Sequence, residues 1–182
     1  ENGKSAKNLM MLYWIDKTDF LQMQKKYNEE KNAIMLIQVD GYDEVLKSAD
    51  EENRPLLSVA IEKELTALEM NSNGALTRTS KDKFFLMNKK ELKKLETDKF
   101  SVLDQIRKID YGNNLPVTIS MGIGIDGDTI NENLKLATGA LDLALGRGGD
   151  QAVIKTKDKF AFYGGKSKAV EKTTKVKSRL IG

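Results

Sequence analysis

The chain of 182 residues contains neither cysteine nor histidine. Without cysteine it can form no disulfide, thiolate nucleophile or zinc–sulfur site. Without histidine it lacks the usual general base near neutral pH and the commonest transition-metal ligand. Any metal ion must therefore be held by Asp, Glu, backbone carbonyl groups or phosphate, which favours Mg²⁺ or Mn²⁺ over zinc.

Long apolar runs and a strong net charge are missing as well. No apolar run approaches the length that spans a bilayer, and there is no signal-peptide pattern. A net charge of +3 is too small to imply nucleic-acid binding. The composition, 40% hydrophobic and 31% charged, suits a soluble globular domain with appendages. Because the chain begins at Glu1 rather than Met and ends in lysine-rich sequence, we expect a piece of a larger protein.

The first third of the chain predicts two strands and a helix. Leu9–Ile15 is an apolar run typical of a strand, and Thr18 or Asp19 can cap a helix over residues 20–30. We expect these elements to be the end of one domain and a connector into the next. Ala33–Val39 is a near-continuous apolar run, which predicts a central strand buried on both faces.

The middle of the chain predicts a β-hairpin. Ala75–Arg78 and Lys83–Met87 are short segments of strand-forming residues that flank a polar turn at residues 79–82. Such turns project from the core and often carry function, because the strands hold an exposed loop in place.

The remaining segments alternate between helix and strand patterns. Gly122 and Gly124, inside a strand pattern, indicate close packing against its backbone. Gly148-Gly149-Asp150 is interpreted as a helix cap and turn, and Gly164-Gly165-Lys166-Ser167 lacks the spacing of a phosphate-binding loop. The order predicts an α+β sandwich with a central mixed sheet and helices on its faces. Its other expected elements are helices from Tyr42, over Arg54–Met70, over Lys90–Asp110 and from a capping box at Thr129, and strands Pro116–Ile125, Ala152–Lys155 and Phe160–Tyr163.

This order, with these residues at the joints, resembles the GGDEF (diguanylate cyclase) fold. Residues 78–84 of the hairpin lie over the family's R-Y-G-G-D-E-F motif. Residues 116–123 resemble its V-T-x-S-x-G-[IV] strand, and residues 137–144 resemble its A-D-x-A-L-Y-x-A helix. The resemblance covers roughly Ala33 to Tyr163 and implies a nucleotide-cyclase-like sandwich.

One run points to a degenerate subfamily. Residues 140–155 (ALDLALGRGGDQAVIK), with the aromatic and glycine residues that follow, resemble the middle domain of membrane-bound cyclic-di-AMP phosphodiesterases of the GdpP/YybT type. The resemblance implies three parts. Residues 1–31 are the tail of a PAS domain and a connector helix, 32–163 a degenerate GGDEF domain, and 164–182 a linker towards a DHH/DHHA1 module.

The resemblance also implies the setting of the longer protein. Such a phosphodiesterase sits on the cytoplasmic face of the cell membrane and hydrolyses cyclic-di-AMP to pApA with Mn²⁺ in its DHH module. A chain without histidine cannot contain that DHH site. Because no apolar run is long enough to span a bilayer, we expect this piece to be soluble. The neighbouring PAS and DHH/DHHA1 domains are its implied partners. Heme in the PAS domain and a homodimer are left open.

Several residues depart from an active cyclase. The family has two aspartates where this chain has Gln38 and Asp40. Ser80 and Lys81 replace the two glycines of the motif, and Lys83 replaces a glutamate. Such a charge reversal is costly, because one ion pair at about 4 Å contributes roughly 4 kcal/mol at an effective dielectric constant near 20. We therefore expect no diguanylate cyclase activity and assign no catalytic residue.

Two other interpretations stay open for the hairpin. It can be a solvated turn without chemistry, or the centre of a weak Mg²⁺-dependent ATPase. In the second case Asp40 and Asp82 would share the metal ion. The phosphates of ATP or another nucleotide would then contact Arg78, Ser80, Lys81 and Lys83. We expect no nucleic-acid binding, because the C-terminal lysines lack interleaved aromatic residues.

Overall fold

Residues 10–78 and 82–165 are described by the computed structural model of the chain. They form a six-stranded mixed sheet in the order β2-β3-β1-β4-β5-β6. Only β4 and β5 pair in parallel, and every other neighbouring pair is antiparallel. The strands are β1 (Asn32–Val39), β2 (Ala75–Arg78), β3 (Asp82–Asn88), β4 (Ile119–Gly124), β5 (Gln151–Lys155) and β6 (Phe160–Gly164).

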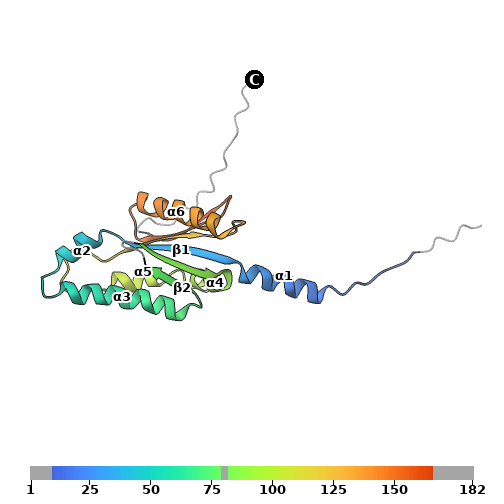
Figure 1. Ribbon diagram of the computed structural model, residues 1–182, viewed down its shortest axis with the longest axis horizontal. Helices are drawn as coiled ribbons and strands as arrows, with labels where there is room; N and C mark the ends of the chain where they lie inside the picture. Colours follow the sequence, from blue (N-terminus) through green and yellow to red (C-terminus); the bar gives the residue numbers. More distant parts are fainter. Residues whose placement is uncertain (1–9, 79–81, 166–182) are drawn as a thin grey trace, which may run out of the picture.

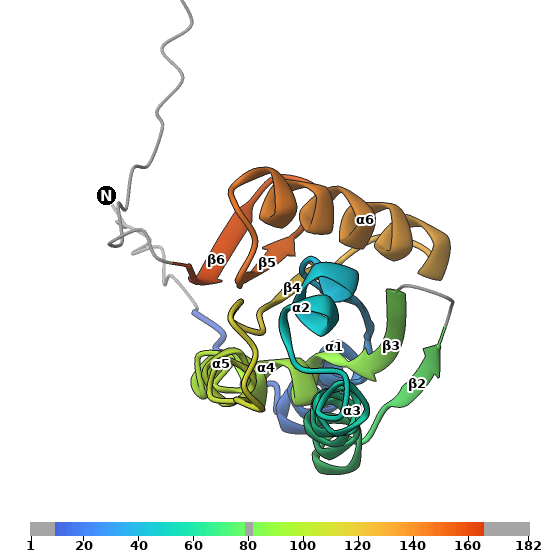
Figure 2. The same ribbon diagram turned by 90° about the vertical axis from the view of Figure 1, so that its left-hand side faces the viewer.

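Helices cover both faces of the sheet, as the sequence predicts (Figures 1 and 2). One face carries α6 (Ile130–Gly146), and the other carries α3 (Arg54–Asn71), α4 (Lys89–Thr97) and α5 (Val102–Arg107). The short α2 (Tyr42–Ser48) follows β1, and α1 (Thr18–Glu30) precedes it. The larger hydrophobic core lies between the sheet and helices α2–α5, and a smaller cluster lies under α6.

Strand β1 is the centre of this sandwich. Ala33, Met35 and Ile37 are buried in the larger core, while Ile34 on the opposite face is also fully buried. The near-continuous apolar run therefore predicted correctly a strand that is covered on both sides. The hairpin of β2 and β3 is confirmed, although residues 79–81 of its turn lie outside the described residues.

Helix α6 packs directly on the backbone of β4. A Cβ atom at Gly122 would lie 2.3 Å from the carbonyl oxygen of Ala137. A Cβ atom at Gly124 would lie 1.9 Å from the carbonyl oxygen of Asn133. These distances confirm that the two glycines mark close packing. The capping box is present with its second bond shifted by one residue. Thr129 accepts from the backbone N–H of Glu132, and Glu132 accepts from that of Asp128 rather than from that of Thr129.

The helix expected over residues 90–110 is interrupted, so that prediction was wrong. Lys99 and Phe100 have left-handed φ angles of 53° and 54°, which end α4 and start α5 in a new direction. This turn points the Phe100 ring into the core. Phe100 is 1% exposed, and the centroid of its ring lies 5.0 Å from that of the Tyr163 ring. Burial of an aromatic side chain offsets the cost of left-handed backbone at two residues that are not glycine.

Tyr163 ties β6 to α4. Its hydroxyl donates a hydrogen bond of 3.0 Å to Glu96. Burial, followed by that bond and the charge of Glu96, raises the pKa of Tyr163 to about 12. The phenol therefore keeps its proton, and with it this link between sheet and helix, up to strongly alkaline pH.

The strand expected over residues 9–15 is not formed in the described part, residues 10–15. These residues have no regular secondary structure and are highly exposed, with Trp14 94% exposed. A strand needs a neighbour to satisfy its backbone groups, and within residues 10–78 and 82–165 none lies beside it. Helix α1 is confirmed and buries none of its residues; it extends away from the sandwich in Figure 1.

The packing of α6 on β4 predicts that Gly124→Ala destabilises the fold. The added methyl group has no room, so the free energy of unfolding should fall by about 2–3 kcal/mol in urea denaturation. Gly146→Ala is the matched control, because a Cβ there meets nothing within 4 Å; it should leave stability unchanged or raise it by less than about 1 kcal/mol. Equal losses in the two variants would contradict this packing.

Candidate functional site

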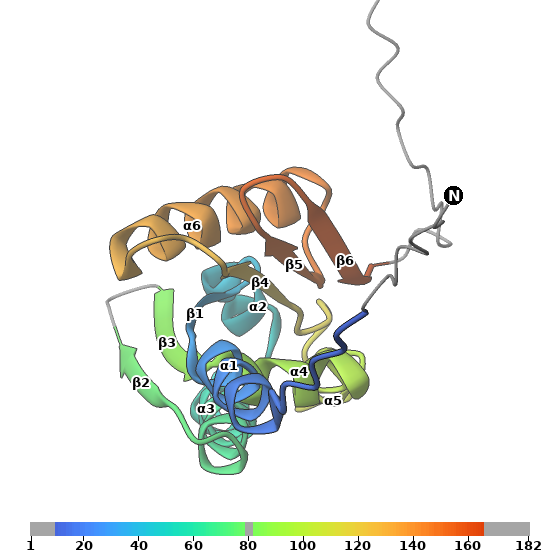
Figure 3. The ribbon, with the colours of Figure 1, turned by 90° about the vertical axis from the view of Figure 1, so that its right-hand side faces the viewer.

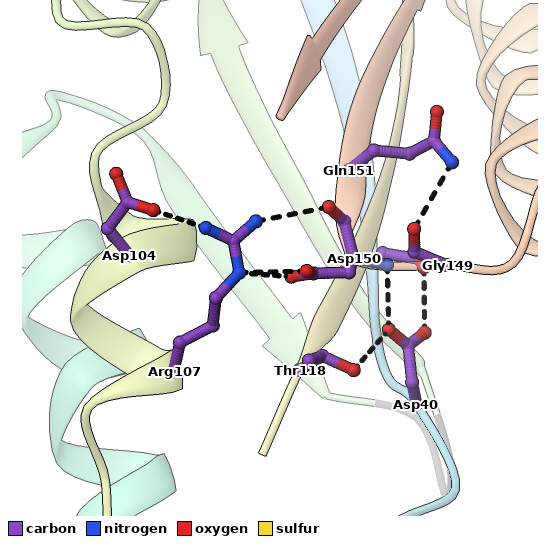
Figure 4. Close-up of polar contacts among 8 residues, drawn as sticks. Asp40, Asp104, Arg107, Thr118, Gly149, Asp150 and Gln151 are labelled. Atoms are coloured by element: carbon purple, nitrogen blue, oxygen red, sulfur yellow. Dashed lines mark hydrogen bonds and ion pairs between the residues drawn. The ribbon is translucent and has the colours of Figure 1, made fainter. Parts of the chain in front are cut away.

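The carboxylate of Asp40 lies at the end of β1 and turns towards β4. The backbone N–H of Asp40 donates to the carbonyl oxygen of Thr118 at 3.0 Å, which extends the pairing of β1 with the chain before β4. Its Oδ2 accepts from the Thr118 hydroxyl at 2.8 Å, and its Oδ1 accepts from the Ser120 hydroxyl at 2.7 Å. Both oxygens of this partly buried carboxylate therefore accept hydrogen bonds, one from a residue of β4 and one from the residue just before β4 (Figure 4).

A third donor comes from the turn that follows α6. The backbone N–H of Asp150 donates to Oδ2 of Asp40 at 3.0 Å. Gly148, Gly149 and Asp150 all have left-handed φ angles, of 101°, 72° and 58°, which curl the turn around the carboxylate. A Cβ at Gly149 would lie 2.7 Å from Oδ2 of Asp40, so only glycine fits there. The interpretation of these glycines as a helix cap and turn is confirmed, since Gly149 N–H closes back on the carbonyl oxygen of Ala144.

Asp150 extends this arrangement to α5 and to the segment after β6. Its carboxylate accepts from Nε of Arg107 at 2.7 and 2.8 Å, and its carbonyl oxygen accepts from Nη2 at 3.3 Å (Figure 4). The same carbonyl oxygen accepts from the backbone N–H of Gly165 at 2.9 Å. We call Asp40, Arg107, Thr118, Ser120 and Asp150 the Asp40–Asp150 network. It joins β1, α5, β4 and the α6–β5 turn.

Sequence reasoning identified one residue of this network as functional. Asp40 was a candidate, while Thr118 and Ser120 were recognised only as part of a strand motif. Arg107 and Asp150 are 43 residues apart, and no local pattern connects them. The usable signal was a glycine pair followed by an aspartate at a helix end, because an aspartate in left-handed backbone is uncommon.

The predicted hairpin residues do not join Asp40 in one place. Lys83 lies opposite Ile37 on the face that carries α3, where its Nζ forms an ion pair of 2.5 Å with Glu62. Gln38 lies opposite Ser120, so Gln38 and Asp40 belong to the α6 face, because side chains alternate along a strand. The Lys83 ammonium and the Asp40 carboxylate therefore point to opposite faces of the sheet.

The other predicted residues are placed only by their backbone. Arg78 lies opposite Lys83, and Asp82 lies opposite Gln38. Ser80 and Lys81 lie outside the described residues. Within the described ranges, no group of three or more Asp or Glu residues is close enough to hold a metal ion. Binding of Mg²⁺ by Asp40 and Asp82, with ATP beside it, stays one of the two alternatives that the sequence left open for the hairpin.

The ion pair within the network predicts that Asp150→Asn destabilises the domain. The Asp150 side chain is 11% exposed, and its loss of charge leaves Nε of Arg107 without its anionic partner. The free energy of unfolding should fall by about 1–3 kcal/mol in urea at neutral pH. Asp104→Asn is the control, since Asp104 pairs with the same Arg107 but is 68% exposed, and should change stability by less than about 0.5 kcal/mol. A smaller effect at Asp150 than at Asp104 would contradict the assignment.

Solved structures with the same architecture include domains of diguanylate cyclases. The GGEEF domain of an active diguanylate cyclase from Vibrio cholerae matches with a TM-score of 0.57 and 11% identity, over 74% of this chain and 88% of that chain. The diguanylate cyclase SiaD of Pseudomonas aeruginosa matches with a TM-score of 0.55 and 19% identity, over 76% of this chain and 58% of that chain. At such identities the likeness shows the fold alone, and that fold is the expected GGDEF sandwich.

Proteins with higher sequence identity to this chain than these solved structures are named cyclic-di-AMP phosphodiesterases. The chain is 39% identical to the cyclic-di-AMP phosphodiesterase PdeA of Listeria monocytogenes and 37% identical to GdpP of Bacillus subtilis. Each alignment covers 94% of this chain and 26% of the relative, so the chain spans about a quarter of their length. A protein of the onion yellows phytoplasma, named a membrane protein–ribosomal bL9 fusion, is 30% identical over 96% of this chain and 21% of its own length.

No helix in the described part of this chain is long and apolar enough to cross a bilayer. The model of the family described as "Cyclic-di-AMP phosphodiesterase GdpP-like, GGDEF domain" matches residues 37–162, which include Asp40 and the turn that binds it. The chain therefore belongs to the GdpP-like GGDEF-domain family.

Proposed function

We propose that this domain is a regulatory, non-catalytic part of a membrane-bound cyclic-di-AMP phosphodiesterase. The single observation that carries the proposal is the state of the Asp40 carboxylate, which accepts hydrogen bonds from three donors of its own chain. The relatives of this chain that are named cyclic-di-AMP phosphodiesterases are about four times as long as the chain. Their additional length leaves room for a separate catalytic module.

The charges around the former motif argue against cyclase chemistry. A two-metal mechanism needs carboxylates that converge on the ions. Gln38 is neutral, Asp40 is engaged by Thr118, Ser120 and the Asp150 N–H, and Lys83 brings a positive charge that pairs with Glu62. Of the three positions that would have to hold two cations, Gln38 has no charge, Asp40 is already hydrogen-bonded, and Lys83 has the opposite charge.

The same network supports a role in passing signals along the chain. Asp150 contacts the end of β1 through Asp40, the end of α5 through Arg107, and the chain after β6 through Gly165. In the longer protein α1 would connect to the preceding PAS domain, and residues after Gly165 would lead to the DHH/DHHA1 module that hydrolyses cyclic-di-AMP to pApA with Mn²⁺. A displacement at one end of the domain can then reach the other through a small number of hydrogen bonds.

The proposal predicts that the domain controls phosphodiesterase kinetics without chemistry of its own. Deletion of residues 33–163 from the full-length protein, with the flanking segments rejoined, should change the rate of cyclic-di-AMP hydrolysis or its regulation, measured as pApA formed. Asp150→Asn should shift the same kinetics, whereas Asp104→Asn should not. The isolated chain should form no cyclic dinucleotide from Mg-GTP. Unchanged hydrolysis after the deletion, or conversion of GTP, would contradict the proposal.

A further inference from the structure

Two aromatic rings are exposed on the edge strand β6. Phe160 is 49% exposed and Phe162 is 44% exposed, and their ring centroids are 6.3 Å apart with planes inclined by only 22°. The register pairs Phe162 with Val153 and Phe160 with Lys155, which places both rings on the face of the sheet that carries α6. Figures 2 and 3 show β6 at the margin of the sheet, beyond β5.

Each ring carries its own cation. The guanidinium carbon of Arg147 lies 4.6 Å from the centroid of Phe162, and the ammonium nitrogen of Lys155 lies 5.3 Å from that of Phe160. Nε of Arg147 also donates to the buried Gln151 at 3.3 Å, which fixes the guanidinium at the end of α6. The β6 face, defined as Arg147, Lys155, Phe160 and Phe162, therefore has the same arrangement twice: an aromatic ring with a positive charge over it.

We propose that the β6 face binds an adenine dinucleotide, and this inference rests on the proposed function. Bases stack on aromatic rings and on guanidinium planes, and phosphates pair with Arg and Lys. A ligand with two bases and two phosphates matches two rings and two cations, whereas an apolar protein segment would leave both charges unmatched. The substrate and the product of a cyclic-di-AMP phosphodiesterase both have this composition.

The position of the face suggests how occupancy would be sensed. Arg147 directly precedes the turn whose Asp150 N–H binds Asp40, and Gln151 directly follows it. A ligand that draws Arg147 away from Phe162 also pulls on this turn. The face would thus report dinucleotide concentration to the Asp40–Asp150 network from a site that is not part of the catalytic module.

The test titrates this chain with pApA, cyclic-di-AMP, AMP, inorganic phosphate and oligoadenylates of increasing length. Binding is followed through the backbone amide resonances of β5 and β6. The dinucleotides should shift these resonances and bind more tightly than AMP, and inorganic phosphate should not compete at equal concentration. Phe162→Leu, which keeps apolar bulk but loses the ring, and Arg147→Gln should each weaken dinucleotide binding by about tenfold. Phe20→Leu is the matched control, because Phe20 is a 64% exposed ring on α1; it should leave the affinity unchanged.

Three results would overturn the inference. The first is the absence of shifts in β5 and β6 at millimolar dinucleotide. The second is equal affinity in Phe162→Leu and in the unaltered chain. The third is affinity for oligoadenylate that keeps rising with its length, since this would assign the face to single-stranded RNA. None of these results bears on the proposed function, which is read from hydrolysis by the full-length protein.

Discussion

The carboxylate of Asp40, held by three hydrogen-bond donors, is the interaction on which the arrangement of this domain depends. Two donors are the hydroxyls of Thr118 and Ser120 beside β1, and the third is the backbone N–H of Asp150 in the turn after α6. These bonds fix the end of the central strand against the start of β4 and β5. Because Asp150 also binds Arg107 through its carboxylate and Gly165 through its carbonyl oxygen, Asp40 and Asp150 together link β1, β4, the α6–β5 turn, α5 and the chain after β6.

This use of Asp40 gives the carboxylate a structural role in the GGDEF fold that does not depend on cyclase chemistry. Hydrogen bonds to a charged acceptor contribute more to stability than neutral ones, and a partly buried carboxylate needs them to offset its desolvation. A side chain that meets this structural need is retained whether or not a metal ion binds nearby. The Lys83–Glu62 pair follows the same logic on the opposite face, where an internal ammonium joins β3 to α3.

Local patterns predicted most of the fold and little of the site. The apolar run of β1, the hairpin, the capping box at Thr129 and the glycines of β4 each depend on residues close together in the sequence, and each was found. Periodicity could not reveal the break at Lys99 and Phe100, because the buried ring that favours it meets Tyr163 from the far end of the chain. The Asp40–Asp150 contact spans 110 residues, and no local spacing records it.

The most direct test compares Asp40→Asn with the unaltered chain in urea denaturation, with and without millimolar Mn²⁺. Asparagine turns one acceptor oxygen into an N–H₂ donor that faces other donors. In metal-free buffer the free energy of unfolding should therefore fall by about 2 kcal/mol. The unaltered chain should unfold at the same urea concentration whether or not Mn²⁺ is present. Stabilisation of the unaltered chain by Mn²⁺ that is lost in Asp40→Asn would contradict the account, because Asp40 would then be a metal ligand.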